Sequence, residues 1–181
     1  MILVFLADGF EELEATAPID ILRRGKKEVL TVGVTGKTVV GSHKIPVICD
    51  RTIDEITFDP SIEAIVLPGG MPGTVNLEKS GALQSIIDAC ASAGRFICAI
   101  CAAPSILGHK GLLRDKEATC YTGFEKDLTG AVVKSQPVVR DGNIITAFGA
   151  GAAFQFGFEI LAAVSDRETS ENIRKSMRFG E

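Results

Sequence analysis

Residues 95–105 read RFICAICAAPS, an apolar strand pattern that runs into a helix start with no intervening loop. Cys101 stands at the junction, and the residues two before and two after it, Ala99 and Ala103, are both small. Small residues at these places permit the sharp strand-to-helix turn called a nucleophile elbow, in which the chain folds back on itself. Pro104 suits the first turn of a helix, where its missing N–H would be unpaired anyway. The stretch therefore predicts a parallel α/β sheet that presents the Cys101 thiol at the carboxyl end of a strand.

The rest of the chain alternates short aliphatic runs with helical patterns, which indicates a parallel sheet with crossover helices. Strands are predicted over 1–7, 28–34, 63–67, 95–100 and 143–148, with shorter pieces near 46–49 and 118–121. Helices are predicted over 10–24, 81–93, 102–112, 150–164 and 167–178. Gly25 is expected to end the first helix as a left-handed cap, and Ser80 and Asp166 to begin later helices. The pair Asp141-Gly142 predicts a hairpin turn. Because no linker or repeat interrupts this pattern, we expect residues 1–181 to form a single three-layer domain.

Composition excludes several classes of protein. The 181 residues are 46% hydrophobic, which argues against disorder, and their net charge of -4 argues against electrostatic binding to nucleic acid. The N-terminal run MILVFLAD lacks the basic residues with which a signal peptide begins, so it indicates a buried strand instead. No apolar run approaches the ~20 residues of a membrane helix, so no membrane contact is expected. Five cysteines form an odd set outside any disulfide scaffold, and we expect reduced thiols in a cytoplasmic protein.

Cys101 is predicted to be reactive, because a helix N-terminus with free amides stabilises a thiolate and lowers the pKa of the thiol. The alternative interpretation is a buried structural cysteine. Cys98 completes a C-x-x-C pattern with Cys101, but an offset of three along a strand is expected to point the two side chains to opposite faces. A dithiol couple is therefore disfavoured, and a metal site more so, since no second ligand pair is present.

Glu14 is the predicted partner of Cys101. At 100° per residue, Phe10, Leu13, Ala17 and Ile21 form one apolar stripe, and Glu14 lies close to that buried face. Burial raises the pKa of a carboxyl group and favours its protonated, hydrogen-bond-donating form, which would suit acid–base chemistry beside a thiolate. Glu11 and Glu12 are interpreted as residues that complement the helix dipole.

The segment Leu67-Pro68-Gly69-Gly70 follows a buried strand, and its glycines leave backbone amides free for a ligand. The amides of Gly70 and Ala102 are candidates for an oxyanion hole, while an ordinary tight turn is the alternative. Gly149-Ala150-Gly151 lacks the third glycine of a dinucleotide fingerprint, so no cofactor is expected. His43 and His109 are interpreted as surface loop residues, and their spacing gives no support for a Cys–His dyad.

Three segments together resemble the DJ/ThiJ/PfpI superfamily, closest to its parkinsonism-associated DJ branch. They read DGFEELE at 8–14, LPGG at 67–70 and AICAAP at 99–104, in order and at the family's spacing. The resemblance implies a flavodoxin-like three-layer sandwich with a mostly parallel sheet and helices on both faces. It also implies a homodimer, Cys101 as nucleophile, Glu14 as its carboxyl partner and Gly70 and Ala102 at the oxyanion positions.

The same resemblance implies cofactor-free conversion of methylglyoxal to lactate, in the manner of glyoxalase III, or a deglycase activity. The alternative it implies is a redox sensor or stress-responsive chaperone that works through oxidation of Cys101. Older family labels are thiamine biosynthesis and proteolysis, but protease-like members carry His directly after the nucleophile, where this chain has Ala102. The stretch ATCYT at 118–122 offers Cys120 and Tyr121 where DJ-branch members often place a His. The branch's Arg-Gly-Pro-Gly is replaced by FGAG at 148–151, which makes the rim of the site more apolar.

Overall fold

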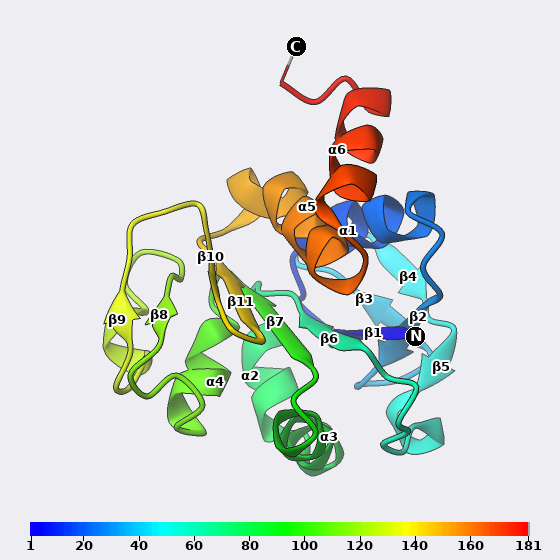
Figure 1. The fold of residues 1–181 in the computed structure, drawn as a ribbon. Coiled ribbons are helices and arrows are strands. Elements are labelled where there is room, and N and C mark those ends of the chain that lie inside the picture. The colour runs from blue at the N-terminus through cyan, green and yellow to red at the C-terminus, as the bar shows by residue number, and fades with distance from the viewer. Residues whose placement is uncertain (181) are drawn as a thin grey trace.

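The computed structural model describes residues 1–180, and a seven-stranded sheet runs through their centre (Figure 1). Its strand order is β10-β11-β7-β6-β1-β2-β5, and all neighbours are parallel except the edge strand β10. The bounds of its strands are β1 Ile2–Leu6, β2 Val29–Gly33, β5 Arg51–Thr52, β6 Ala64–Leu67, β7 Phe96–Ile100, β10 Val138–Asp141 and β11 Ile144–Ala147. The order β2-β1-β6-β7-β11 is the flavodoxin-like order 2-1-3-4-5, so the predicted fold class is confirmed.

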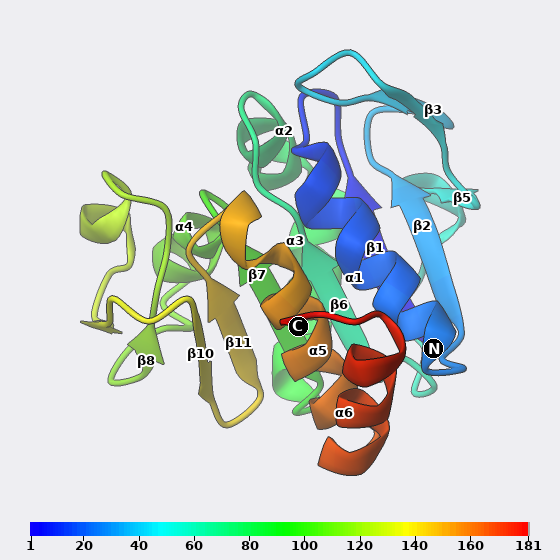
Figure 2. The ribbon, with the colours of Figure 1, turned by 90° about the horizontal axis from the view of Figure 1, so that it is seen from above.

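Helices cover both faces of the sheet (Figures 1 and 2). One face carries α1 Glu12–Arg24, α5 Ala153–Val164 and α6 Arg167–Ser176, and the other carries α2 Gly73–Lys79, α3 Gly81–Ser92 and α4 Pro104–His109. Two small sheets lie outside the main one: an antiparallel hairpin of β3 Thr38–Val40 and β4 Pro46–Ile48, and a parallel pair of β8 Glu117–Ala118 and β9 Val132–Val133. Short 3-10 turns span Ile53–Glu55, Glu125–Asp127 and Ala150–Ala152. Within residues 1–180, no helix is both long and apolar enough to cross a membrane.

The central strands are buried on both faces because each face is covered by helices. Every residue of β1, β6 and β11 is buried, and their side chains divide into two apolar layers, one on each side of the sheet. This explains why these strands read as continuous apolar runs rather than as alternating patterns.

Several predicted boundaries were wrong. The helix predicted over 102–112 spans only Pro104–His109, because residues 101–103 form the turn of the elbow and Gly111, at φ +72°, ends the helical path. Helix α2 and strands β3, β5 and β9 were not predicted from the sequence, since these short elements carry little periodic signal. Predictions of helix starts at Ser80 and Asp166 are confirmed, as each side chain accepts a backbone N–H three residues on.

Gly25 is not the predicted left-handed cap, because its φ is -72° and Lys26 takes the left-handed conformation at φ +60°. Gly25 is small for another reason: a Cβ there would lie 2.5 Å from Leu161 Cδ1. The 138–147 hairpin is confirmed, but its turn residues are Gly142 and Asn143, since Asp141 pairs with Ile144. Of the turn residues, Gly142 takes the positive φ.

Candidate active site

Cys101 lies at the carboxyl edge of the sheet, directly after β7 and next to the ends of β6 and β1. Strand order reverses between β1 and β6, which is the place where ligands bind in open α/β sheets. The backbone of Cys101 takes φ +65°, a left-handed conformation rare for a residue with a side chain. It is fixed by a bond from its N–H to the Ala147 carbonyl (2.9 Å) and by a bond from the Tyr121 N–H to its own carbonyl (2.8 Å). The elbow predicted from the sequence is therefore present.

Glu14 reaches the Cys101 thiol from the first turn of α1. Its side chain is 1% exposed, and its carboxyl accepts the Gly69 N–H at 2.9 Å and the Ala150 N–H, and hydrogen-bonds with the thiol. Gly69 permits this contact, since a Cβ there would lie 2.6 Å from Cys101 Cβ and 2.8 Å from Glu14 Oε2. The structure thus brings together the two side chains that the sequence analysis paired.

Burial opposes a negative charge on either group. Burial raises the pKa of Glu14 to about 7, as expected from the sequence. The hydrogen bonds from Cys101 and from the backbone amides of Gly69 and Ala150 lower this pKa but do not outweigh burial. Burial, followed by the charge of ionised Glu14, raises the pKa of Cys101 to about 12. The lowered thiol pKa expected from the sequence is therefore wrong. The two backbone N–H groups do lower this pKa, but burial and the carboxylate outweigh them.

The amides of Gly70 and Ala102 both hydrogen-bond to the Cys101 sulfur. Gly70 takes φ +88°, and a Cβ there would lie 2.5 Å from the Glu11 nitrogen, so only glycine fits the turn. Both residues are thus placed where their N–H groups meet a negative charge on or next to the sulfur.

A pocket of about 440 Å³ opens above the thiol. Its lining residues come from the ends of several elements and are Glu11, Glu14, His43, Gly70, Met71, Cys101, Ala102, Tyr121, Phe124 and Ala150. The chemistry-bearing groups that share it are a thiol, two carboxyl groups, a phenol and an imidazole.

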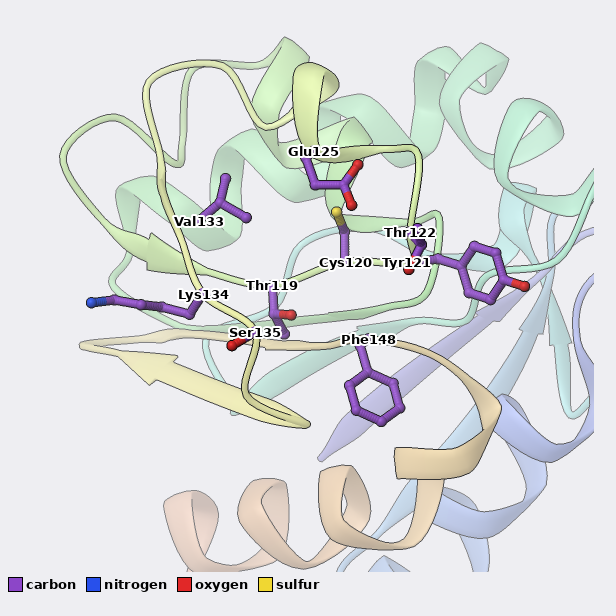
Figure 3. A pocket seen from close by; sticks show the side chains of 9 residues that line it. All are labelled: Thr119, Cys120, Tyr121, Thr122, Glu125, Val133, Lys134, Ser135 and Phe148. Atoms are coloured by element: carbon purple, nitrogen blue, oxygen red, sulfur yellow. The ribbon is translucent and has the colours of Figure 1, made fainter.

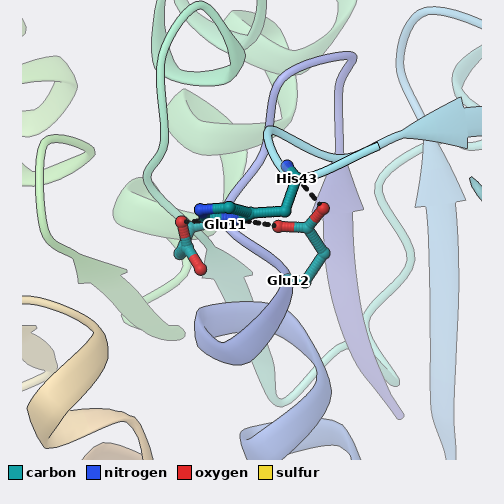
Figure 4. Close-up of side chains that lie close together, drawn as sticks. All are labelled: Glu11, Glu12 and His43. Atoms are coloured by element: carbon teal, nitrogen blue, oxygen red, sulfur yellow. Dashed lines mark hydrogen bonds and ion pairs between the residues drawn. The ribbon is translucent and has the colours of Figure 1, made fainter. Parts of the chain in front are cut away.

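His43 is a site residue that sequence reasoning missed (Figure 4). It lies in the β3–β4 loop, as expected, but its Nδ1 lies 2.9 Å from Glu12 Oε2 and 3.5 Å from Glu11 Oε2. Glu12 is not an exposed residue at the helix start: it is 7% exposed and accepts the backbone N–H of His43 at 2.8 Å. Leu13, predicted on the apolar stripe, is instead 55% exposed. No motif links positions 12 and 43, and only the missed β3–β4 hairpin brings them together.

His109 is the last residue of α4, not a loop residue, and its ring contacts Glu78. It does not line the Cys101 pocket. Cys98 is fully buried in β7, and burial raises the pKa of its thiol. Its side chain and that of Cys101 pack in the same apolar layer, contrary to the expected opposite faces, because the left-handed turn at Cys101 breaks the alternation of the strand.

A second hollow of about 650 Å³ lies beside the first, between the β8–β9 pair and the end of β11 (Figure 3). Tyr121 lines both hollows. Cys120 lines the second one, and burial raises the pKa of its thiol to about 11. Its other lining residues are Thr119, Thr122, Glu125, Val133, Lys134, Ser135 and Phe148.

The flavodoxin-like strand order, an elbow cysteine and a buried carboxyl against its sulfur define a class of α/β proteins built around one thiol. Residues 1–163 match the model of the DJ-1/PfpI family, and the chain belongs to that family.

Relatives cover nearly the whole chain. The chain is 32% identical to the Drosophila melanogaster protein dj-1beta over 97% of its own length and 95% of that protein. It is 32% identical to a protein named a deglycase from Pyrococcus abyssi, over 81% and 88% of the two chains. A cysteine-to-alanine mutant of a DJ-1 superfamily protein from Salmonella typhimurium superposes with a TM-score of 0.93 at 33% identity, covering 99% and 98%.

Proposed function

We propose that this protein is a cysteine-dependent, cofactor-free enzyme that acts on small reactive carbonyls, either free methylglyoxal or the adducts it forms on proteins. The observation that carries the proposal is the set of groups on the Cys101 sulfur, namely the Glu14 carboxyl and the amides of Gly70 and Ala102. The relative from Pyrococcus abyssi named a deglycase supports the same class of reaction.

The proposed reaction begins when the Cys101 sulfur, having passed its proton to Glu14, adds to the aldehyde carbon of methylglyoxal. The two amides hold the oxygen that gains negative charge, and Glu14 gives the thiol proton to that oxygen, which yields a hemithioacetal and restores the carboxylate. Glu14 then moves the proton of the aldehyde carbon to the neighbouring carbon, and the hydroxyl proton of the first carbon passes to the oxygen of the second, which leaves a thioester of lactate. Water cleaves this thioester, so lactate is released and the thiol is restored. One carbon is oxidised and the next reduced, so the sequence needs no external oxidant.

The test is methylglyoxal consumption with lactate measured as product. We expect Cys101→Ala to lose more than about 100-fold of the turnover, because the nucleophile is gone. Cys90→Ala is the matched control, since Cys90 is a buried free thiol on α3 away from the pocket. Equal rates for the wild type and Cys101→Ala would remove the proposal.

A redox sensor or stress-responsive chaperone is the second candidate, and the same donors around the sulfur favour it. Two equivalents of peroxide would convert the thiolate to a sulfinate with release of two waters, and Glu14 would donate a hydrogen bond to the new oxygens. Intact mass after mild peroxide treatment tests this candidate. A gain of about 32 Da on Cys101 ahead of the other cysteines supports it, and random oxidation counts against it.

We also propose that residues 1–181 act as one domain and pair with a second copy of the chain. The outward face of the β3–β4 hairpin supports this pairing, because Val40, Ile45 and Ile48 are large, apolar and exposed there. The free state of all five cysteines is consistent with a cytoplasmic location, which we propose for the protein.

A further inference from the structure

We propose that His43 is a second acid–base residue of the Cys101 site, oriented by Glu12 and acting at the mouth of the pocket. The inference rests on the proposed carbonyl chemistry and adds a residue to it. That chemistry has to handle protons at two adjacent carbons and their two oxygens, while Glu14 offers a single proton-carrying group.

The pocket places His43 and Cys101 around the same space, at different depths. Glu14 lies at the bottom and is almost fully buried, Cys101 is partly buried, and the His43 side chain is 69% exposed. A substrate whose aldehyde carbon bonds to the sulfur therefore directs its second carbon outward. His43 is the imidazole that lines the pocket at that end.

Although it is exposed, His43 is held firmly (Figure 4). Glu12 accepts the backbone N–H of His43 (2.8 Å), and its Oε2 accepts the Nδ1–H of the ring (2.9 Å between Nδ1 and Oε2). The Ser42 backbone N–H donates to the Phe10 carbonyl (2.8 Å). Gly41 leaves room for the Glu12 carboxylate, which a Cβ at that position would contact. A carboxylate on one ring nitrogen fixes the orientation and tautomer of a histidine, as in other acid–base sites.

Because Nδ1 is bonded to Glu12, Nε2 is the ring nitrogen that is free to exchange a proton with the substrate. Among the described residues, Nε2 has no hydrogen-bond partner, and the His43 side chain lines the pocket. The ionisable groups around the ring are Glu11 and Glu12 on the start of α1, and Glu14, Cys101 and Tyr121 across the pocket. The hydrogen bond to Glu12, followed by the charge of Glu11, raises the pKa of His43, so the imidazolium form persists nearer to neutral pH. The ring can then give a proton as well as take one.

In the hemithioacetal, Nε2 of His43 gives its proton to the oxygen of the second carbon while Glu14 takes the proton of the first carbon. The product is an enediol, and both side chains have changed protonation state. Glu14 then delivers its proton to the second carbon, and the hydroxyl proton on the first carbon returns to Nε2. The thioester forms and both groups are restored, so protons and electrons balance.

The test is the variant His43→Asn, which keeps a side-chain donor toward Glu12 but has no titrating nitrogen. We expect kcat for methylglyoxal to fall about 100-fold, the usual contribution of one acid–base group. The rate of Cys101 alkylation should stay within about threefold, because the thiol and its donors are untouched. His109→Asn is the matched control, since the chain's other histidine lies on α4 outside the pocket.

A second variant separates proton transfer from a structural role. Glu12→Gln removes the negative charge and leaves only a neutral acceptor for His43, so the pKa of His43 should fall and the histidine limb of the kcat–pH profile should move to lower pH. An unchanged kcat in His43→Asn, or a profile that Glu12→Gln does not move, overturns the role of His43 and leaves the Cys101 reaction standing. A wild-type protein without Cys101-dependent turnover overturns both.

Discussion

At the scale of single residues, Cys101 and Glu14 form a pair in which only one negative charge is tolerated near neutral pH. Both are shielded from water, so the first charge appears near pH 7 and the second only near pH 12. Between these values the pair holds one proton, which lies either on the carboxylate or on the sulfur. The nucleophilic form is the one in which Glu14 holds the proton. In the proposed reaction, the reactivity of Cys101 therefore depends on where the shared proton lies rather than on a thiol that is acidic by itself.

The variant Glu14→Gln tests this sharing of one proton. It removes the carboxylate that helps to raise the pKa of Cys101 but keeps a hydrogen-bond donor, so we expect the thiol pKa to fall. The measurement is the pH dependence of alkylation by iodoacetamide, followed by mass on Cys101. Glu63→Gln is the control, because Glu63 pairs with Lys27 at the other end of the strands. A midpoint that does not fall would contradict a carboxylate that raises the thiol pKa and would show that Glu14 acts mainly as a neutral donor.

At the scale of elements, the parts that could be predicted were those with strong local signals. The central strands and the elbow were read correctly because an apolar run, small flanking residues and a proline are all local features. The burial of Glu14 followed from helical periodicity.

The errors arose where distant segments meet. The hairpin β3–β4 is too short to show a periodic pattern, yet its loop covers the start of α1. It buries Glu12 and provides His43 with a partner, so the expected surface carboxylate became part of the site's framework. Leu13, expected on the buried stripe, lies outside the core. No spacing rule along the chain reveals a contact between positions 12 and 43.

The contact between α1 and α5 supports the site, since Glu14 lies on the first helix and the N–H of Ala150 lies just before the second. Gly157 allows the two helices to approach, because a Cβ there would lie 2.7 Å from Ile21 Cδ1 and 3.0 Å from Pro18 Cα. We expect Gly157→Ala to lower the free energy of unfolding by about 1–3 kcal/mol through overpacking. Urea denaturation provides the measurement. Gly81→Ala on α3 is the control, since nothing lies within 4 Å of its added Cβ and stability should be unchanged or slightly higher.

At the scale of the whole molecule, the strand order explains why three separate segments meet at one thiol. After β1 the next strand of the sheet, β2, pairs on one flank of β1, and β6 later pairs on its opposite flank. The connections that follow β1 and β6 therefore run apart and leave a crevice at the carboxyl ends of these two strands. The segment 8–14, the glycines at 69–70 and the elbow after β7 all reach this crevice. The topology alone therefore assembles the carboxyl, the amides and the sulfur.

The proposed pairing of two chains is also a property of the whole molecule. Ile48 is 76% exposed on the outward face of β4, opposite Thr38. We expect Ile48→Lys to shift the protein from dimer to monomer, because a charge replaces apolar contact surface. Sedimentation velocity measures the change. Val132→Lys is the control, since this residue is also apolar and exposed but lies on β9. A wild-type monomer at all concentrations, or equal behaviour of both variants, would contradict the pairing.

The positive φ of Cys101 affects which substitutions the backbone favours at position 101. A side chain in this conformation costs about 1 kcal/mol or more, a penalty that glycine does not carry. Cysteine and glycine codons differ by one nucleotide, so the mutation that relieves this backbone penalty lies a single step away. The backbone conformation thus does not favour a cysteine at this position, and under the proposed function the chemistry of the thiol is what maintains it. In a lineage that did not use the proposed reaction, the backbone at position 101 would favour a change to glycine.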